Sequence, residues 1–284
     1  VMDHIDEFES MFRRAERESF EHATIPIESV VFITDQASDE SERRRLEVQE
    51  FLPLLKNVNS WCEITSDQYS DVGELLTRLD QQQTDLVITY RHLQEQSLVP
   101  QHSLGVYLDV LSQVATIPVL VLPGTSAHPK PLSGHVCDRV MVVADHISGD
   151  NGLINYGSRM CPDNGTLWLC HVEDDAIFER YMRIIERIPQ IASDQARELI
   201  ETTLLKEAQD YIATCITELK DAKPSVSYEG RVTRGHFLKQ YTELIESGEI
   251  DLLVTNTRDE DQLAMHGMAY SLSVELIDTA MLLL

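Results

Sequence analysis

The feature that most constrains this chain is a repeat in its apolar segments. The runs 30–35 and 140–145 are each apolar and each close on an aspartate. Later in each half an Asp-Leu-x-x-Thr motif recurs, at 85–89 and at 251–255. Generic alternation of strands and helices would not place the same motif twice at matching points. Duplication of one unit is therefore the preferred interpretation.

The apolar runs alternate with segments of helical periodicity. Segment 72–79 carries its apolar residues on one stripe, whereas 85–89 is apolar throughout, as in a strand buried on both faces. Such alternation forms βαβ units with right-handed crossovers and a parallel sheet, so the sequence predicts an α/β fold, twice. The expected strands are 29–35, 61–65, 85–89, 118–123, 139–145, 166–172, 225–230, 251–255 and 280–284. The expected helices are 3–22, 41–56, 72–79, 103–115, 174–221, 237–246 and 268–278.

A segment rich in proline and glycine separates the two copies. Three prolines and two glycines fall in or beside 124–134, which indicates a domain boundary. The predicted organisation is an N-terminal helix, a shortened first domain, a linker and a second domain. Their ranges are 1–24, 25–123, 124–138 and 139–284.

The first copy is the shorter one. From Asp35 to Asp85 is 50 positions, whereas from Asp145 to Asp251 is 106. We expect the stretch missing from the first half to correspond to the strand 166–172 and the long helical region that follows it. The N-terminal helix is then expected to cover part of the sheet that this deletion exposes.

This order of elements resembles the universal stress protein family in its tandem form. The resemblance is carried by 84–123, and by 140–145 together with 250–284. It implies three-layer domains of the adenine nucleotide alpha hydrolase-like kind, with sheet order 3-2-1-4-5, that often dimerise through the last strand. In this chain those strands would be 119–122 and 281–284. Two copies would then form a pseudo-dimer within one chain. A homodimer of two such chains is a further alternative.

Members of the family that bind ATP carry Gly-x-x-Gly, nine further residues, and then Gly-Ser/Thr. The glycines let backbone N–H groups approach the phosphates, and the next helix N-terminus favours the negative charge. This sequence keeps only the late glycine in each half. The residues at the four motif positions are Tyr90, Leu93, Gly105 and Val106 in the first half, and Asn256, Asp259, Gly267 and Met268 in the second.

The loops near these positions also differ in charge. In the second half, 258–261 reads Arg-Asp-Glu-Asp, and one carboxylate about 5 Å from a phosphate charge costs roughly 3 kcal/mol at an effective dielectric near 20. In the first half Arg91 and His92 suit a phosphate better, but Tyr90 would crowd the pocket. We therefore expect no ATP bound in the family's manner. A nucleotide held through adenine and ribose stays an alternative.

Five residues remain as candidates for contact with a nucleotide. Asp35 and Asp145 stand where the family contacts the adenine and ribose, although each could instead cap the following helix. All five candidates, including the two late glycines, are Asp35, Asp145, Asn256, Gly105 and Gly267.

Other chemistry has little support in the sequence. Histidines and cysteines around 128–137 and 146–171 lack a recurring metal-ligand spacing, so buried cysteines and surface histidines are the preferred interpretation. Carboxylates near Cys161 and Cys170 are expected to raise the thiol pKa. The sequence contains no Walker A loop, nucleophile elbow or HExxH motif. The glycine-containing segment 148–152 is expected to form a turn and a helix cap.

Charge and cysteine content restrict partners and location. Asp and Glu number 48 against 23 Lys and Arg, a formal net charge of -25, which argues against binding nucleic acid or an anionic membrane. The five cysteines form no CxxC pair, and no apolar run approaches the roughly 18 residues of a membrane span. These features predict a cytoplasmic protein with reduced thiols.

The function expected is a non-catalytic stress-response or regulatory module that acts through protein contacts, without a cofactor. One alternative is a sensor that binds ATP or AMP in a degenerate pocket, and another is a nucleotide hydrolase. The resemblance is also compatible with a chain that serves as the cytoplasmic regulatory domain of a transporter. The helices expected in 174–221 either cover the sheet or offer a surface for a partner.

Overall fold

The computed structural model describes residues 20–95, 103–114, 116–132, 134–144, 147–188, 193–257, 265 and 267–284. The first half contains β1 (Ser29–Thr34), α2 (Ser38–Phe51), the 3-10 helix η1 (Pro53–Asn57), β2 (Ser60–Thr65), α3 (Val72–Asp80), β3 (Leu86–Arg91), α4 (Val106–Val114) and β4 (Val119–Thr125). The second half contains β5 (Arg139–Val143), α5 (Asn151–Met160), β6 (Thr166–Asp174), α6 (Asp175–Ile185), α7 (Ser193–Ala222), β7 (Ser227–Gly235), α8 (Phe237–Gly248), β8 (Leu252–Thr255), α9 (Gly267–Glu275) and β9 (Ala280–Leu283).

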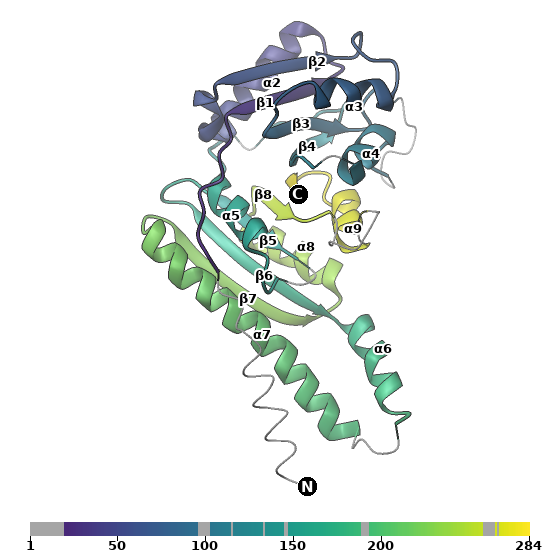
Figure 1. The fold of residues 1–284 in the computed structure, drawn as a ribbon, viewed down its shortest axis with the longest axis vertical. Helices are drawn as coiled ribbons and strands as arrows, with labels where there is room; N and C mark the ends of the chain where they lie inside the picture. Colours follow the sequence, from purple (N-terminus) through teal and green to yellow (C-terminus); the bar gives the residue numbers. More distant parts are fainter. Residues whose placement is uncertain are drawn as a thin grey trace.

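The strands described here form one sheet in the order β2-β1-β3-β4-β9-β8-β5-β6-β7 (Figure 1). Apolar side chains of α2, α5 and α7 pack on one face of this sheet, and those of α3, α4, α8 and α9 pack on the other. Each half is therefore a helix–sheet–helix sandwich with a mostly parallel sheet, which confirms the predicted α/β fold.

Local chemistry explains where several elements begin and end. The predicted helix 41–56 stops at Phe51, because Pro53 cannot continue an α-helix, and a 3-10 turn follows. Asp150 caps α5 by accepting the Leu153 N–H at 2.9 Å, which confirms the predicted turn and cap in 148–152. The predicted helical region 174–221 consists of two helices, α6 and α7.

The two halves differ in strand number. The order β7-β6-β5-β8-β9 is the 3-2-1-4-5 arrangement, whereas the first half has only β2-β1-β3-β4. β2 pairs in parallel with β1 just as β6 pairs with β5. The strand missing from the first half is therefore the counterpart of β7, at the sheet edge, together with α7 that packs on it. The expectation that 166–172 had no counterpart was wrong, because spacing along the chain does not fix a strand's place in the sheet.

The last strands of the two halves join the halves into one sheet. β4 and β9 pair antiparallel, with Val119 opposite Leu283 and Val121 opposite Met281. Every other strand pair is parallel. This is the pairing that the resemblance implied for a pseudo-dimer within one chain.

The repeated aspartates of the Asp-Leu-x-x-Thr motifs have the same role in both halves. Asp85 Oδ2 accepts the backbone N–H groups of Glu28 and Ser29 at 2.9 Å. Asp251 Oδ2 accepts those of Asp138 and Arg139 at 3.1 Å. Each aspartate thus holds the start of the neighbouring strand, which explains why the motif recurs.

The N-terminal helix predicted over 3–22 lies outside the described residues up to position 19. From Phe20 to Glu28 the chain forms neither helix nor strand, and Phe20 and Ile27 are buried in the core. Asn155 of α5 donates to the Glu21 carbonyl and accepts the Ala23 N–H, both at 3.0 Å. The entering segment is thus fastened to the second half before it reaches β1. Among the described residues, no helix combines the length and apolarity needed to cross a membrane.

Candidate functional site

The candidate site of the first half lies at the carboxyl ends of β1, β3 and β4, where open α/β sheets commonly bind ligands. Asp35 follows β1, and the loop 92–95 follows β3. Gly105 directly precedes α4. The structure brings Asp35 and Gly105 to the same short loop, so these two predicted residues belong to one site.

Asp35 is fully engaged by its own chain. Its Oδ2 accepts the Gln94 N–H at 2.9 Å, and its Oδ1 accepts the Ser126 hydroxyl and the Gln36 side-chain amide. It therefore links the loops after β3 and β4. The alternative that Asp35 caps α2 is wrong, because Ala37 occupies that N-cap and no side chain bonds there.

A carboxylate of this chain occupies the N-terminus of α4. Glu95 Oε1 accepts the Val106 N–H at 2.6 Å, and Glu95 Oε2 lies 3.0 Å from His92 Nδ1. A helix N-terminus attracts negative charge through its free N–H groups and its dipole. In the family's pattern a phosphate would use those groups. Here the Glu95 carboxylate takes that place, and the spacing of residues in the sequence did not indicate this contact.

His92 and Gly105 pack backbone against backbone. Gly105 has φ of +87°, and a Cβ built on it would lie 2.7 Å from the Cα of His92. The buried His92 also places Nε2 2.8 Å from the carbonyl of Ser103. The glycine is thus required for contact with the protein's own loop, so its presence does not by itself indicate a phosphate site.

Neither Tyr90 nor Arg91 faces the candidate pocket, which corrects two expectations. The Tyr90 hydroxyl accepts Arg44 Nε at 3.0 Å among the side chains that pack against α2. Arg91 is buried and donates to the carbonyls of Ser273 and Leu276 at 3.0 and 3.1 Å. These carbonyls end α9 of the other half, so Arg91 joins the two halves and is unavailable to a phosphate. Burial lowers the pKa of Arg91 from 12.5 to about 10.

The second half shows fewer contacts among its described residues. The Asn256 side-chain amide donates to Asp150, the cap of α5. Gly267 begins α9, and a Cβ built on it would meet no atom of the described residues within 4 Å. Asp145 and the acidic loop from Arg258 to Asp261 lie outside the described residues. Of the candidates in this half, the structure therefore places only Asn256 and Gly267.

One group of side chains in the described part of the chain has the geometry to hold a metal ion. Ligand atoms of His135, Asp138 and Asp251 lie within 4.8 Å of one another. Asp251 already accepts two backbone N–H groups, the role that Asp85 has in the first half without such neighbours. A structural role for Asp251 therefore accounts for the contacts seen here.

Burial favours the protonated form of the Cys161 and Cys170 thiols. Burial raises the pKa of Cys161 and of Cys170 to about 12. The sequence had attributed this effect to nearby carboxylates, but burial is the larger cause. Lys223 and Arg231 act in the opposite direction on Cys161 and Cys170 respectively. A nucleophilic role for either thiol has no support, since the reactive form is the thiolate.

Comparison with known proteins bears on the fold. No protein-family model and no curated protein sequence matches the chain. Among solved structures, a protein of unknown function from Pseudomonas aeruginosa PAO1 has a TM-score of 0.55 at 13% identity, covering 91% of this chain and 92% of its own. A Pseudomonas aeruginosa UCBPP-PA14 protein, provisionally assigned as a universal stress protein, has a TM-score of 0.52 at 12% identity, covering 91% and 93%. A universal stress protein from Archaeoglobus fulgidus DSM 4304 has a TM-score of 0.47 at 11% identity, covering 90% and 95%.

These likenesses extend over both halves and agree with the strand order described above. The chain has the fold of the universal stress proteins, in a two-copy form whose first copy lacks one edge strand.

Proposed function

We propose that this chain is a non-catalytic regulatory module of the universal stress protein type, which acts through protein contacts and does not hold ATP in the manner of the family. The observation that carries the proposal is the Glu95 carboxylate at the N-terminus of α4. A phosphate there would displace Glu95 or lie beside it. Two such charges about 5 Å apart cost roughly 3 kcal/mol at an effective dielectric near 20.

The other contacts of the first site support the same conclusion. Asp35 is bonded to Gln94 and Ser126, and Gly105 is packed on His92. Each group that would contact a nucleotide in the resemblance therefore already has a partner within the protein. Binding would require these contacts to break before new ones form.

A second candidate function, a nucleotide sensor, rests on the second half alone. Among the described residues, nothing packs against Gly267 at the N-terminus of α9 as His92 packs against Gly105 at α4. A nucleotide bound there would use the half that keeps five strands. The acidic residues in 258–261 oppose a triphosphate, so AMP fits this alternative better than ATP.

Thermal unfolding with and without millimolar ATP, AMP and Mg²⁺ tests both functions. A ligand at 100 times its Kd adds about 2.7 kcal/mol of stability, so binding would raise the midpoint by several degrees. We expect no shift with either nucleotide. Equilibrium dialysis with labelled ATP should likewise show no retention.

A nucleotide-dependent shift would overturn the proposal, and a Gly267→Val variant would locate the site. The described residues leave room for a valine side chain at this position, which would fill the space that a ligand would need. If the variant abolished the shift, the sensor function would be supported in the second half. If the variant kept the shift, the nucleotide would bind in the first half, where it would have to displace Glu95 or lie beside it.

A further inference from the structure

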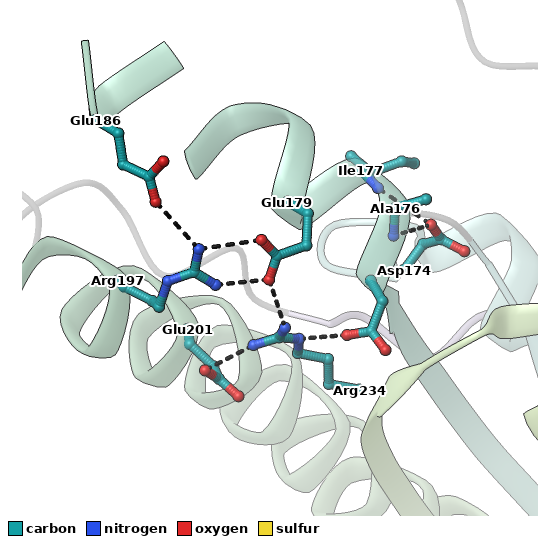
Figure 2. A network of polar contacts seen from close by, with 9 residues as sticks. Asp174, Ala176, Ile177, Glu179, Glu186, Arg197, Glu201 and Arg234 are labelled. Atoms are coloured by element: carbon teal, nitrogen blue, oxygen red, sulfur yellow. Dashed lines mark hydrogen bonds and ion pairs between the residues drawn. The ribbon is translucent and has the colours of Figure 1, made fainter. Parts of the chain in front are cut away.

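Helix α6 and the first turns of α7 form an arm that projects from the sheet (Figure 1). Phe178 and Met182 of α6 are buried within the arm. Arg197 of α7 bonds Glu179 at 2.6 and 3.0 Å, and Arg234 of β7 bonds Asp175 at 2.6 Å (Figure 2). The arm is therefore an ordered structure tied to the body by ion pairs, with a defined outer surface.

The outer surface of α6 carries an apolar stripe, here called the arm stripe. Its four members are exposed by 40–60%: Ile177, Tyr181, Ile184 and Ile188. Spacings of four and three residues place Ile177, Tyr181 and Ile184 on one face of α6, and Ile188 follows shortly after the last helical residue, Ile185. The face is separate from the one that buries Phe178 and Met182. Exposed apolar residues aligned in this way mark a contact surface.

The arm stripe is bordered by positive charge in a strongly acidic chain. Arg180, Arg183 and Arg187 are exposed on α6 and directly after it, whereas Asp174 and Asp175 stand at its start. The two other carboxylates, Glu179 and Glu186, are both bonded to Arg197 of α7. The remaining charge is thus acidic where the helix leaves the body and basic toward its tip. A complementary partner would be an amphipathic segment with acidic residues near the tip and basic residues near the body.

We propose that residues 3–17 of this chain are that partner and dock on the arm stripe. Their apolar residues recur with helical spacing and are Ile5, Phe8, Met11 and Phe12. Their charges are unevenly divided in the required direction: Asp3, Asp6, Glu7 and Glu9 come first, and Arg13, Arg14 and Arg17 come later, with Glu16 among them. This contact goes beyond the proposed function, because it concerns a surface remote from the nucleotide site.

The direction in which the chain runs would bring the charges of 3–17 opposite the complementary charges of α6. Asn155 holds 21–23 on α5, and the hydroxyl of Tyr211 of α7 donates to Asn151 of the same helix at 3.0 Å. Residues before Phe20 thus begin beside the body end of α7. Running outward, they would place Arg13–Arg17 near the base of α6 and Asp3–Glu9 near its tip.

The length of the segment also matches. From Tyr211 to Arg197, which contacts the middle of α6, is 14 residues of helix or about 21 Å. A helix over 3–17 spans about 22 Å. The helix alone therefore reaches the level of Arg197 at the middle of α6. Residues 18–20 would add about 10 Å if extended, which is enough to bring the segment to the end of the arm stripe.

Hydrogen exchange in the full chain, followed by mass spectrometry of peptides from 3–18, tests the proposal. We expect exchange of these amides to be at least about tenfold slower in the unchanged chain than in a Tyr181→Ser/Ile184→Ser variant. A Val106→Ser/Val114→Ser variant removes two similarly exposed apolar side chains from α4 and should leave exchange in 3–18 unchanged.

A charge exchange separates docking from a general loss of stability. An Arg183→Glu/Arg187→Glu variant should lose the protection, and adding Asp3→Arg/Asp6→Arg should restore it. Equal exchange rates in the unchanged chain and both arm variants would overturn the proposal. Protection that falls on tenfold dilution would also overturn it, because the occupant would then be a second copy of the chain.

Discussion

The two halves use the same framework and differ at the end of the sheet where a ligand would bind. Asp85 and Asp251 hold the starts of neighbouring strands through the same pair of backbone contacts. In contrast, Gly105 is packed against His92, whereas a Cβ built on Gly267 would meet no atom of the described residues within 4 Å. The contacts that define the strands are thus shared by the two halves, and the described surroundings of the two late glycines are not.

The halves also differ at the seam that joins them. Arg91 donates to Leu122 at 3.3 Å as well as to two carbonyls at the end of α9. Its counterpart Thr257 donates only to Leu284, through both its hydroxyl and its N–H group. One half thus supplies a guanidinium that crosses the seam, and the other supplies a local contact.

An Arg91→Met substitution should therefore have the largest effect. It removes the guanidinium donor from three buried carbonyls, of which that of Leu276 still accepts the Thr279 N–H at 3.4 Å. It also relieves the cost of burying a charge, so we expect a loss of about 3 kcal/mol in unfolding free energy. Urea denaturation measures it. Thr257→Val should cost only about 1 kcal/mol, since the backbone N–H still donates to Leu284. An Arg91→Met variant as stable as the unchanged chain would show that the seam does not depend on Arg91.

The two late glycines give the next comparison. Gly105→Ala places a Cβ 2.7 Å from backbone at φ of +87°, and we expect a loss of about 2 kcal/mol. Gly267→Ala introduces a methyl group that meets no atom of the described residues within 4 Å, at the first position of a helix, and should change stability by less than about 0.5 kcal/mol. Thermal unfolding of both variants measures the difference. Equal losses would mean that the loop before α9 packs as tightly as the loop before α4.

A smaller effect should appear in the pH dependence of the second half. Burial, the largest cause, raises the pKa of Asp251 above 3.8. The backbone N–H groups of Arg139 and Asp138 and the charge of His135 oppose this rise, and the Asp138 carboxylate adds to it. Because the folded state holds this proton more tightly, its contribution to stability falls as the pH rises from 3.8 through the raised pKa.

An Asp251→Asn variant removes this dependence and keeps an oxygen that accepts the backbone N–H groups. The stability of the unchanged chain relative to the variant should decline by less than about 1.4 kcal/mol per pH unit in that window, and then level off. Unfolding free energies at successive pH values measure the decline. A rise of the unchanged chain relative to the variant would contradict it.

Most of the fold could be predicted from the sequence because it depends on apolar runs and on the Pro and Gly residues that end helices and strands. Segments 85–89 and 251–255 read as buried strands, and Pro53 was overlooked as the end of α2. The place of β2 beside β1 could not be predicted. The number of residues between two strands does not determine how many other strands lie between them in the sheet.

The site was less predictable because its contacts join residues that no pattern links. Glu95 reaches the N-terminus of α4 only because His92 and Gln94 adopt positive φ, at 54° and 56°, without being glycine. A carboxylate eleven positions before the helix has no recognisable spacing. The direction in which Arg91 points depends on the other half of the chain, so local sequence carries no sign of it.

The antiparallel pairing of β4 with β9 has a consequence for assembly. Each of these strands has a neighbour on both sides, so neither has free backbone groups with which to recruit another molecule. In relatives that assemble through the last strand, that contact depends on concentration. Here the two copies are covalently connected, so dilution does not separate them, and any larger assembly must form through other surfaces.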